Sequence, residues 1–238
     1  MDWSNLAQRS LGRERVVKLV YWAYRHGIVV DSPMRSLAST RNHAVLQGEY
    51  IRCSSLELVA REILERNIPG AVAEVGVYRG EFARLINIAF PGKKLYLFDT
   101  FSGFDNKQAR EDRTQKHIRT DLLERRVFCD TSIDIVLSKM EMRENCVVMP
   151  GVFPQSAASC DESCFSFVSL DCDLYRPIYE GLRYFYPKLS RGGYMFVHDY
   201  NNASYGGAKK AVRQFAAEEN VSFFPLSDAC GSAIISKP

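Results

Sequence analysis

Short apolar runs alternate with helical patterns along most of the chain. Five runs between residues 71 and 199 each have the length of one strand, and amphipathic segments separate them. These runs are AVAEVGV (71–77), KLYLFD (94–99), CVVMP (146–150), FSFVSLD (165–171) and GYMFVHD (193–199). Apolar strands that alternate with helices are typical of a parallel sheet with helices on both faces. The pattern therefore predicts an α/β fold.

The last two apolar runs differ from the others in how they are joined. VSFFPL (221–226) and SAIIS (232–236) are separated only by SDACG. Five residues are too few for the crossover helix that parallel strands require. The two runs are therefore expected to pair antiparallel, as a terminal hairpin at the edge of the sheet or just inside it.

Two amphipathic helices are predicted ahead of the first strand. In residues 13–26 apolar residues recur at steps of three and four, and Gly27 closes the pattern. A second helix begins at the serines after Cys53 and ends at Pro69 and Gly70. We assign residues 1–50 to an N-terminal helical arm and residues 51–238 to one domain. The arm is expected to pack on its own domain or on a partner subunit, and we expect a homo-oligomer.

Composition and charge narrow the class of partner. The 238 residues suffice for one domain with a full core, and 46% of them are hydrophobic. The 31 basic and 28 acidic residues nearly balance, and no long basic run is present. The sequence therefore lacks the electrostatic footprint of a nucleic-acid-binding protein, and a small-molecule partner is expected.

The cysteines and the N-terminal pattern predict a cytoplasmic protein. Seven cysteines, an odd number, are scattered without C-x-x-C spacing, which indicates thiols in a reducing compartment rather than a zinc site. The N-terminus lacks a signal-peptide pattern, and no apolar run reaches membrane-spanning length. We therefore expect no membrane partner.

A highly charged segment follows the second strand. Residues 105–126 carry many charges of both signs and few large apolar side chains. Such a segment is typically a solvated helix and loop. Because it directly follows the carboxyl end of a strand, where open α/β sheets bind ligands, it is alternatively a mobile cover over the active site.

The turn after the first strand carries the first candidate site. In AEVGVYRGEFARLI, which spans residues 73–86, Glu74 ends the strand and Gly76 and Gly80 follow. A dinucleotide-binding turn would have the spacing G-x-G-x-x-G, which is absent here. This spacing disfavours an NAD-dependent oxidoreductase.

Acidic residues end three further strands on the same expected edge. Asp99 ends the second run, Asp171 and Asp173 follow the fourth, and Asp199 follows His198 after the fifth. An acid at the end of the second strand of such a fold accepts hydrogen bonds from ribose hydroxyls, which is the role predicted for Asp99. Asp173, on a strand-to-helix turn, is alternatively a helix cap.

Seven ordered segments resemble the macrocin O-methyltransferase family. They are AEVGVYRGEFA, LYLFDTFSGF, DTSIDIVLSKM, VVMPGVFPQS, the long stretch from SLDCDLYRPIYEG to GGYMFVHDYNN, GAKKAVRQF and CGSAIISK. The resemblance runs from about Cys53 to the C-terminus. It implies a Rossmann-like, seven-stranded class I methyltransferase sheet and a soluble enzyme that methylates sugar hydroxyls of natural products, with S-adenosylmethionine as the cofactor.

The resemblance also implies roles for individual residues. Gly76 would let the backbone approach the methionine part of the cofactor, Glu74 would lie beside its amino group, and Asp99 would hold the ribose. Gly151 to Phe153 would lie along the adenine. The DTS segment, 130–132, is a helix cap or a ligand contact. The candidate cofactor-binding residues are Glu74, Gly76, Tyr78, Gly80, Asp99, Ser102, Gly151, Val152, Phe153 and Asp171.

A divalent metal, usually magnesium, is a further implication of the resemblance. Asp171 and Asp199 match two of its ligands, and His198 replaces an acid at the third position. Because Mg²⁺ prefers oxygen ligands, the histidine favours Mn²⁺ or no metal as alternatives. It is also a candidate base for the acceptor hydroxyl. Asp171, His198 and Asp199 are thus the candidate catalytic and metal-binding residues.

Two alternatives to a sugar O-methyltransferase remain open at this stage. The metal arrangement resembles that of small catechol-type methyltransferases, so the acceptor is alternatively a phenolic hydroxyl. The His198 replacement also allows a cofactor-binding structural partner that has lost turnover.

Overall fold

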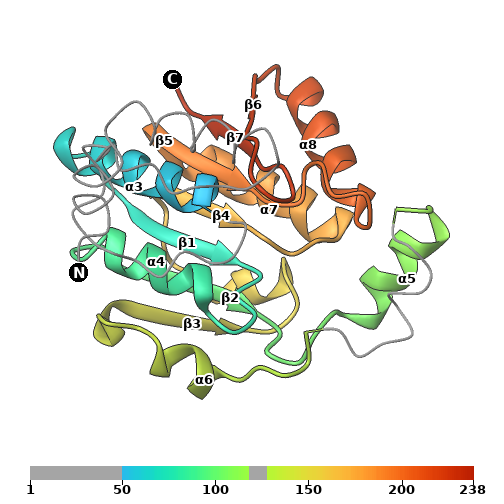
Figure 1. Ribbon diagram of the computed structural model, residues 1–238, viewed down its shortest axis with the longest axis horizontal. Helices are drawn as coiled ribbons and strands as arrows, with labels where there is room; N and C mark the ends of the chain where they lie inside the picture. The colour runs from blue at the N-terminus through green and yellow to red at the C-terminus, as the bar shows by residue number, and fades with distance from the viewer. Residues whose placement is uncertain (1–49, 118–127) are drawn as a thin grey trace, which may run out of the picture. The chain divides into compact units, whose positions relative to one another are not determined.

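The computed structural model describes residues 50–117 and 128–238, and these residues form a seven-stranded sheet with helices on both faces. The order of the strands is β3-β2-β1-β4-β5-β7-β6, with β1 to β5 parallel and β6 and β7 antiparallel (Figure 1). The strands are β1 Ala71–Val75, β2 Leu95–Asp99, β3 Cys146–Pro150, β4 Phe165–Leu170, β5 Leu189–Val197, β6 Phe224–Pro225 and β7 Ala233–Ser236. The predicted fold and its terminal hairpin are confirmed, whereas residues 1–49 of the predicted arm lie outside the described residues.

Helices connect the parallel strands and cover both faces of the sheet. The α-helices are α3 Tyr50–Glu65, α4 Glu81–Ala89, α5 Asn106–Thr114, α6 Ile133–Ser138, α7 Tyr175–Lys188 and α8 Gly206–Glu218, and the 3-10 helices are η2 Arg143–Asn145 and η3 Gln155–Ser159. Alternating side chains divide the core: Ala71, Ala73 and Val75 of β1 pack with α7 and α8, whereas Val72 packs with α3 and α4. Each face of the sheet is therefore buried, as continuous apolar strands predict.

Two helix starts test the capping predictions. The α3 helix includes Ser54, whose hydroxyl donates to the carbonyl of Ile51, so the serines after Cys53 lie inside the helix and do not begin it. The predicted cap in the DTS segment is confirmed, because the Ser132 side chain accepts from the backbone N–H of Ile135 and caps α6.

The chain changes direction across the sheet between β1 and β4. From β1 it runs outward through β2 to β3, and then it returns to β4 and continues to β5. The carboxyl ends of β1 and β4 therefore form a crevice of the kind in which open α/β sheets bind ligands. Among the described helices, none combines the length and the apolar character needed to cross a membrane.

Candidate active site

A cavity of about 390 Å³ lies at the carboxyl ends of the parallel strands. Gln108 of α5 and residues at or just after the carboxyl ends of β1, β2, β3, β4 and β5 contribute to its lining. Ten predicted site residues are among the lining residues: Glu74, Gly76, Tyr78, Asp99, Gly151, Val152, Phe153, Asp171, His198 and Asp199. The structure thus brings most of the predicted residues to one place.

Gly80 and Ser102 do not line this cavity. Gly80 precedes α4 with a positive φ of 83°, and an added Cβ would lie 3.1 Å from a methyl carbon of Val136. The carbonyl of Ser102 accepts from the thiol of Cys129. Both residues therefore shape loops around the cavity.

Gly76 is required by the neighbouring strand. Its φ is 86°, and a Cβ at this position would lie 2.0 Å from the carbonyl oxygen of Asp171. The Gly76 N–H donates to the carbonyl of Phe98. Only glycine allows the turn after β1 to pass this close to the end of β4.

Glu74 is a buried acid with an oxygen that faces no donor. Its side chain is 1% exposed, and Oε1 accepts from the Ser169 hydroxyl at 3.4 Å. Within the described residues, Oε2 has no hydrogen-bond partner. Burial, with the nearby charge of Asp171, raises the pKa of Glu74 well above its usual value. This buried acid, with one oxygen lacking a donor, thus lies at a place suited to a cation.

Asp99 holds the turn between β1 and α4. Its Oδ2 accepts from the N–H groups of Val77 and Tyr78 at 2.7 and 2.9 Å, and Oδ1 accepts from that of Phe101 at 2.7 Å. A carboxylate has further lone pairs, so these three bonds leave room for ribose hydroxyls. Asp99, which was predicted to bind the ribose, therefore also stabilises the turn after β1.

An aromatic wall lines the cavity beside Gly151 and Val152. The Phe153 ring stacks on Phe185 with centroids 5.9 Å apart and meets Phe98 edge-on at 5.7 Å. Its carbonyl accepts from the side-chain amide of Gln108 on α5, at 2.8 Å. The wall is therefore fixed from both sides, and its flat apolar surface suits a purine.

Tyr78 joins the glycine turn to the segment before α6. Its hydroxyl donates to Asp130 at 2.7 Å, and Arg79 pairs with the same carboxylate at 3.0 Å. The Tyr78 ring meets Phe128 edge-on at 5.1 Å. Asp130, in the predicted DTS segment, thus fixes the cavity rim while Ser132 caps the helix.

Asp171, His198 and Asp199 lie together after β4 and β5. His198 Nδ1 is 3.0 Å from an oxygen of each aspartate. Asn202 donates to the other oxygen of Asp199 at 2.6 Å. Neighbouring parallel strands end at the same edge, so the register of β4 and β5 sets this arrangement.

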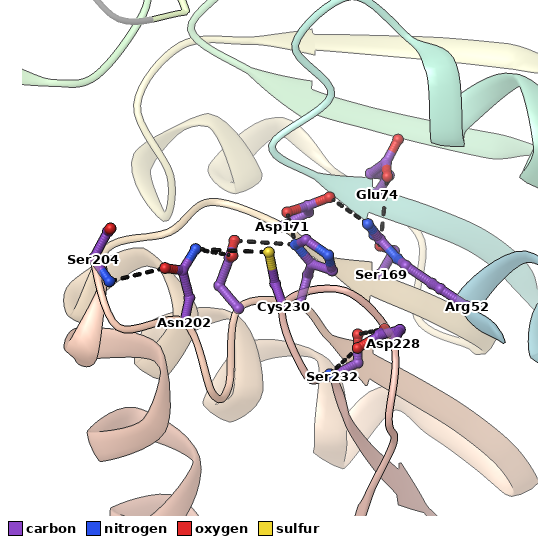
Figure 2. Close-up of polar contacts among 11 residues, drawn as sticks. Arg52, Glu74, Ser169, Asp171, Asn202, Ser204, Asp228, Cys230 and Ser232 are labelled. Atoms are coloured by element: carbon purple, nitrogen blue, oxygen red, sulfur yellow. Dashed lines mark hydrogen bonds and ion pairs between the residues drawn. The ribbon is translucent and has the colours of Figure 1, made fainter. Parts of the chain in front are cut away.

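A buried arginine that the sequence interpretation missed completes the cluster. Arg52 on α3 is 4% exposed and pairs with Asp171 at 2.9 Å, and it also donates to Ser169 (Figure 2). Its guanidinium lies 3.7 Å from the centre of the Phe82 ring. A signal exists in the sequence, because position 52 precedes Leu56 by one turn on the buried stripe of α3.

The charges of this cluster shift one another's pKa values. Burial alone would raise the pKa of Asp171, but Arg52 and His198 outweigh it and lower that pKa. Burial alone would lower the pKa of His198, but Asp171 outweighs it and raises that pKa. The pKa of Asp199 is lowered against burial by the hydrogen bonds from His198 and Asn202. The favoured state is thus two carboxylates beside two cations.

Asp112 on α5 caps the start of α7. Its carboxylate accepts from the N–H of Tyr175 at 2.9 Å, whereas Leu174, the residue before the helix, offers no side-chain cap. The proposed cap, Asp173, instead lines the cavity with a positive φ of 59°. The charged segment after β2 therefore contacts the site through α5.

Residues 42–229 match the family described as Macrocin-O-methyltransferase (TylF), and this match spans most of the chain. The chain belongs to this family. It is therefore an O-methyltransferase, as the resemblance of its motifs predicted. The matched residues include strands β1 to β6 and every residue that lines the cavity.

Three curated relatives of the chain are named as O-methyltransferases. A tetracenomycin rhamnosyl 4'-O-methyltransferase of Streptomyces olivaceus is 23% identical over 77% of this chain and 71% of its own. Mycinamicin III 3''-O-methyltransferase of Micromonospora griseorubida is 24% identical over 72% and 70%. Demethyldecarbamoylnovobiocin O-methyltransferase of Streptomyces niveus is 23% identical over 71% and 67%.

Solved structures of methyltransferases share the fold. The O-methyltransferase NovP has a TM-score of 0.64 with 21% identity, over 78% of this chain and 79% of its own. The calicheamicin methyltransferase CalS11 has a TM-score of 0.58 with 17% identity, over 89% and 95%. These likenesses confirm the class I methyltransferase fold.

The magnesium predicted at Asp171, His198 and Asp199 does not fit the donor set. Mg²⁺ requires near-octahedral oxygen ligands. Here the histidine nitrogen lies between the two carboxylates, and Arg52 binds the outer oxygen of Asp171. A different group, His198, Asp199 and Cys230, has ligand atoms within 4.8 Å of one another. That nitrogen, oxygen and sulfur set suits a softer ion than Mg²⁺.

Proposed function

We propose that this enzyme methylates a sugar hydroxyl of a glycosylated small molecule, with S-adenosylmethionine as the methyl donor. The family membership supports the reaction. The names of the related enzymes support the acceptor, since they include a rhamnosyl 4'-O-methyltransferase and a mycinamicin 3''-O-methyltransferase.

The buried oxygen of Glu74 is the observation that carries the cofactor assignment. A carboxyl group with one oxygen lacking a donor among the described residues fits an ammonium group. On the other side of the cavity, the wall of Val152 and Phe153 fits a flat purine ring. Asp99 lies between these two ends and has lone pairs for the ribose. The residues present therefore fit S-adenosylmethionine.

The acceptor side of the cavity contains groups that can move a proton. Bound S-adenosylmethionine would supply a methyl group on a positively charged sulfur. An alcohol is a poor nucleophile, so its proton must leave as the new oxygen–carbon bond forms. Asp171 and Asp199 can take this proton at a carboxylate oxygen. His198 is held protonated between them, which favours an aspartate over the histidine as the base.

Side chains around α5 can exclude water from the reaction. Phe104 and Tyr205 line the cavity and meet edge-on with centroids 6.1 Å apart. Gln108 lines it as well and is bound to the wall at Phe153. These contacts support the proposal that residues 105–117 of the charged segment cover the active site, whereas residues 118–126 of that segment lie outside the described residues.

Cofactor and acceptor are tested separately. Isothermal titration calorimetry should show binding of S-adenosylhomocysteine and no binding of NAD, and the reverse result would overturn the proposal. Methyl transfer is then measured on nucleotide sugars, macrolide and aromatic glycosides, and catechols. We expect turnover on a glycoside, whereas turnover on catechols alone would favour the phenolic alternative. Cofactor binding without turnover on any acceptor would favour a structural partner.

The partner predictions need their own experiment. The homo-oligomer was inferred from the amphipathic pattern of residues 13–26, which lie outside the described residues. Sedimentation velocity of the full chain should give a mass above 27.1 kDa, and a monomer at all concentrations would contradict the inference.

A further inference from the structure

Each carboxylate oxygen of Asp171 and Asp199 lies within hydrogen-bonding distance of a nitrogen, and the two aspartates share the single N–H of His198 Nδ1. One oxygen of Asp171 is 2.9 Å from the guanidinium of Arg52, and the other is 3.0 Å from Nδ1 of His198. One oxygen of Asp199 is 3.0 Å from the same Nδ1, and the other accepts from Asn202. A magnesium ion would have to displace one or more of these donors.

The His198 ring lies where a metal ion bridging Asp171 and Asp199 would lie. A single nitrogen lies at equal distance from two carboxylates that belong to neighbouring strands. This is the place that one bridging cation would occupy, because a bridge needs short contacts to both acids. Arg52 adds a permanent positive charge on the far side of Asp171.

We propose that the His198 imidazole and the Arg52 guanidinium replace a divalent cation in this active site, so that the acceptor is bound without metal. The inference deepens the proposed function and rests on it. His198 holds the two carboxylates together, and Arg52 neutralises the one nearer the cofactor residue Glu74, to which Ser169 links it. The carboxylates can then receive the acceptor hydroxyl directly.

Binding of Mn²⁺ tests this replacement without any acceptor. Mn²⁺ is titrated into metal-free wild-type protein, His198→Asp and His198→Asn with saturating S-adenosylhomocysteine, and the free ion is measured by electron paramagnetic resonance. We expect His198→Asp, which supplies the missing oxygen ligand, to bind Mn²⁺ about tenfold or more tightly than wild type. His198→Asn, which has the same shape but no charge, should bind as weakly as wild type.

Two results would overturn the inference. The first is wild-type binding of Mn²⁺ as tight as that of His198→Asp, and the second is no gain in His198→Asp despite normal S-adenosylhomocysteine binding. Co²⁺ tests the candidate site of His198, Asp199 and Cys230. If wild type with Co²⁺ shows a thiolate absorption band that disappears in Cys230→Ser, the inference of a metal-free site would also be overturned. Absence of S-adenosylhomocysteine binding by wild type would instead refute the proposed function, and this binding is measured separately from the Mn²⁺ affinities.

Discussion

The two sides of the cavity, which we propose to bind the cofactor and the acceptor, carry their charges differently. On the cofactor side, Glu74 is buried with a raised pKa and has one oxygen without a donor among the described residues. On the acceptor side, Asp171 and Asp199 have lowered pKa values because Arg52 and His198 lie against them. Glu74 therefore gains a charge when a cation arrives, whereas Asp171 and Asp199 are already neutralised.

The difference suggests that each side has a separate task. Taking two charges out of water is costly unless they are paired, so the acceptor cluster is organised before any ligand binds. A single buried carboxyl avoids that cost by keeping its proton until a cation is present. The same kind of residue thus serves binding on one side and proton removal on the other.

The largest effect is expected from Asp171→Asn, which removes one of the two ion-paired carboxylates on the acceptor side. The change leaves Arg52 and His198 facing one uncharged amide, so methyl transfer should fall by about 10²- to 10⁴-fold. The free energy of unfolding should fall by up to about 3–5 kcal/mol, since the buried Arg52 loses its ion pair and His198 keeps only Asp199 as a counter-charge. Urea unfolding and single-turnover methyl transfer measure the two effects.

A matched control for Asp171→Asn is Asp161→Asn, which changes an exposed aspartate ahead of the same strand. It should leave both quantities unchanged, because no ion pair of the described residues involves Asp161. Equal behaviour of the two variants would show that the charge network contributes nothing to the reaction.

Glu74→Gln tests the proposed role of the Glu74 carboxyl group in binding the cofactor. Glutamine has the shape of the protonated acid, so the stability of the free protein should change little. The affinity for S-adenosylmethionine should fall by about 10- to 100-fold, because a charge-assisted hydrogen bond to the ammonium is lost. Glu81→Gln is the control, since Glu81 lines the same cavity but pairs with Lys139. Similar losses in both variants would contradict a specific role for Glu74.

Cofactor binding should release a proton from Glu74. Its pKa is raised in the free protein, and a bound cation lowers it, so affinity should rise with pH until the raised pKa is passed. The stability of the free protein should change with pH in the opposite direction. As the pH rises above 4.5, the ordinary pKa of glutamate, Glu74 loses its proton in the unfolded chain before it does in the folded protein, so the free energy of unfolding falls. Calorimetry in buffers of different ionisation enthalpy should detect about one proton. Glu74→Gln should release none, and no release in wild type would refute the protonated state.

A smaller effect, about tenfold in affinity, is expected from Asp99→Ala. The carboxylate accepts from three backbone N–H groups, so its loss should also lower the free energy of unfolding by about 1–3 kcal/mol. Asp99→Asn keeps one oxygen and should recover part of the stability. Lower affinity with unchanged stability would mean that the turn does not depend on Asp99.

The sheet could be predicted from the sequence because local patterns determine it. Runs such as KLYLFD are short, apolar and separated by helices, and SDACG is too short for a crossover. The strand ends in turn locate Glu74, Asp99 and Asp171. The start of α3 was misjudged because serines can cap a helix or lie inside it, and only the neighbouring chain decides.

The partners of the site residues were not predictable in the same way. Arg52 reaches Asp171 from a helix 119 positions earlier in the chain, and Asp112 reaches Tyr175 across 63 positions. Such contacts arise from tertiary packing, which one sequence does not report. Gly76 was expected to let the backbone approach the ligand, and the structure adds a second reason for glycine there, because a Cβ would lie against the carbonyl of Asp171.

The smallest effect is expected from Asp112→Ala, which tests whether α5 belongs to the cofactor side. Asp112 is 3% exposed and caps α7 from a neighbouring helix. Losing such a cap costs about 0.5–2 kcal/mol of stability. Because Gln108 on the same helix holds the Phe153 carbonyl, affinity for S-adenosylhomocysteine should also fall by about two- to fivefold.

Two further variants make the Asp112 result specific. Asp112→Asn keeps a capping oxygen and should restore most of the affinity. Glu111→Ala removes the partly buried ion pair with Arg176 between the same two helices, which is expected to contribute less than about 1 kcal/mol. If Glu111→Ala and Asp112→Ala weaken cofactor binding equally, the buried cap has no special role. If Asp112→Ala lowers stability but leaves the affinity unchanged, α5 does not contribute to cofactor binding, and any role of α5 in the site would concern the acceptor.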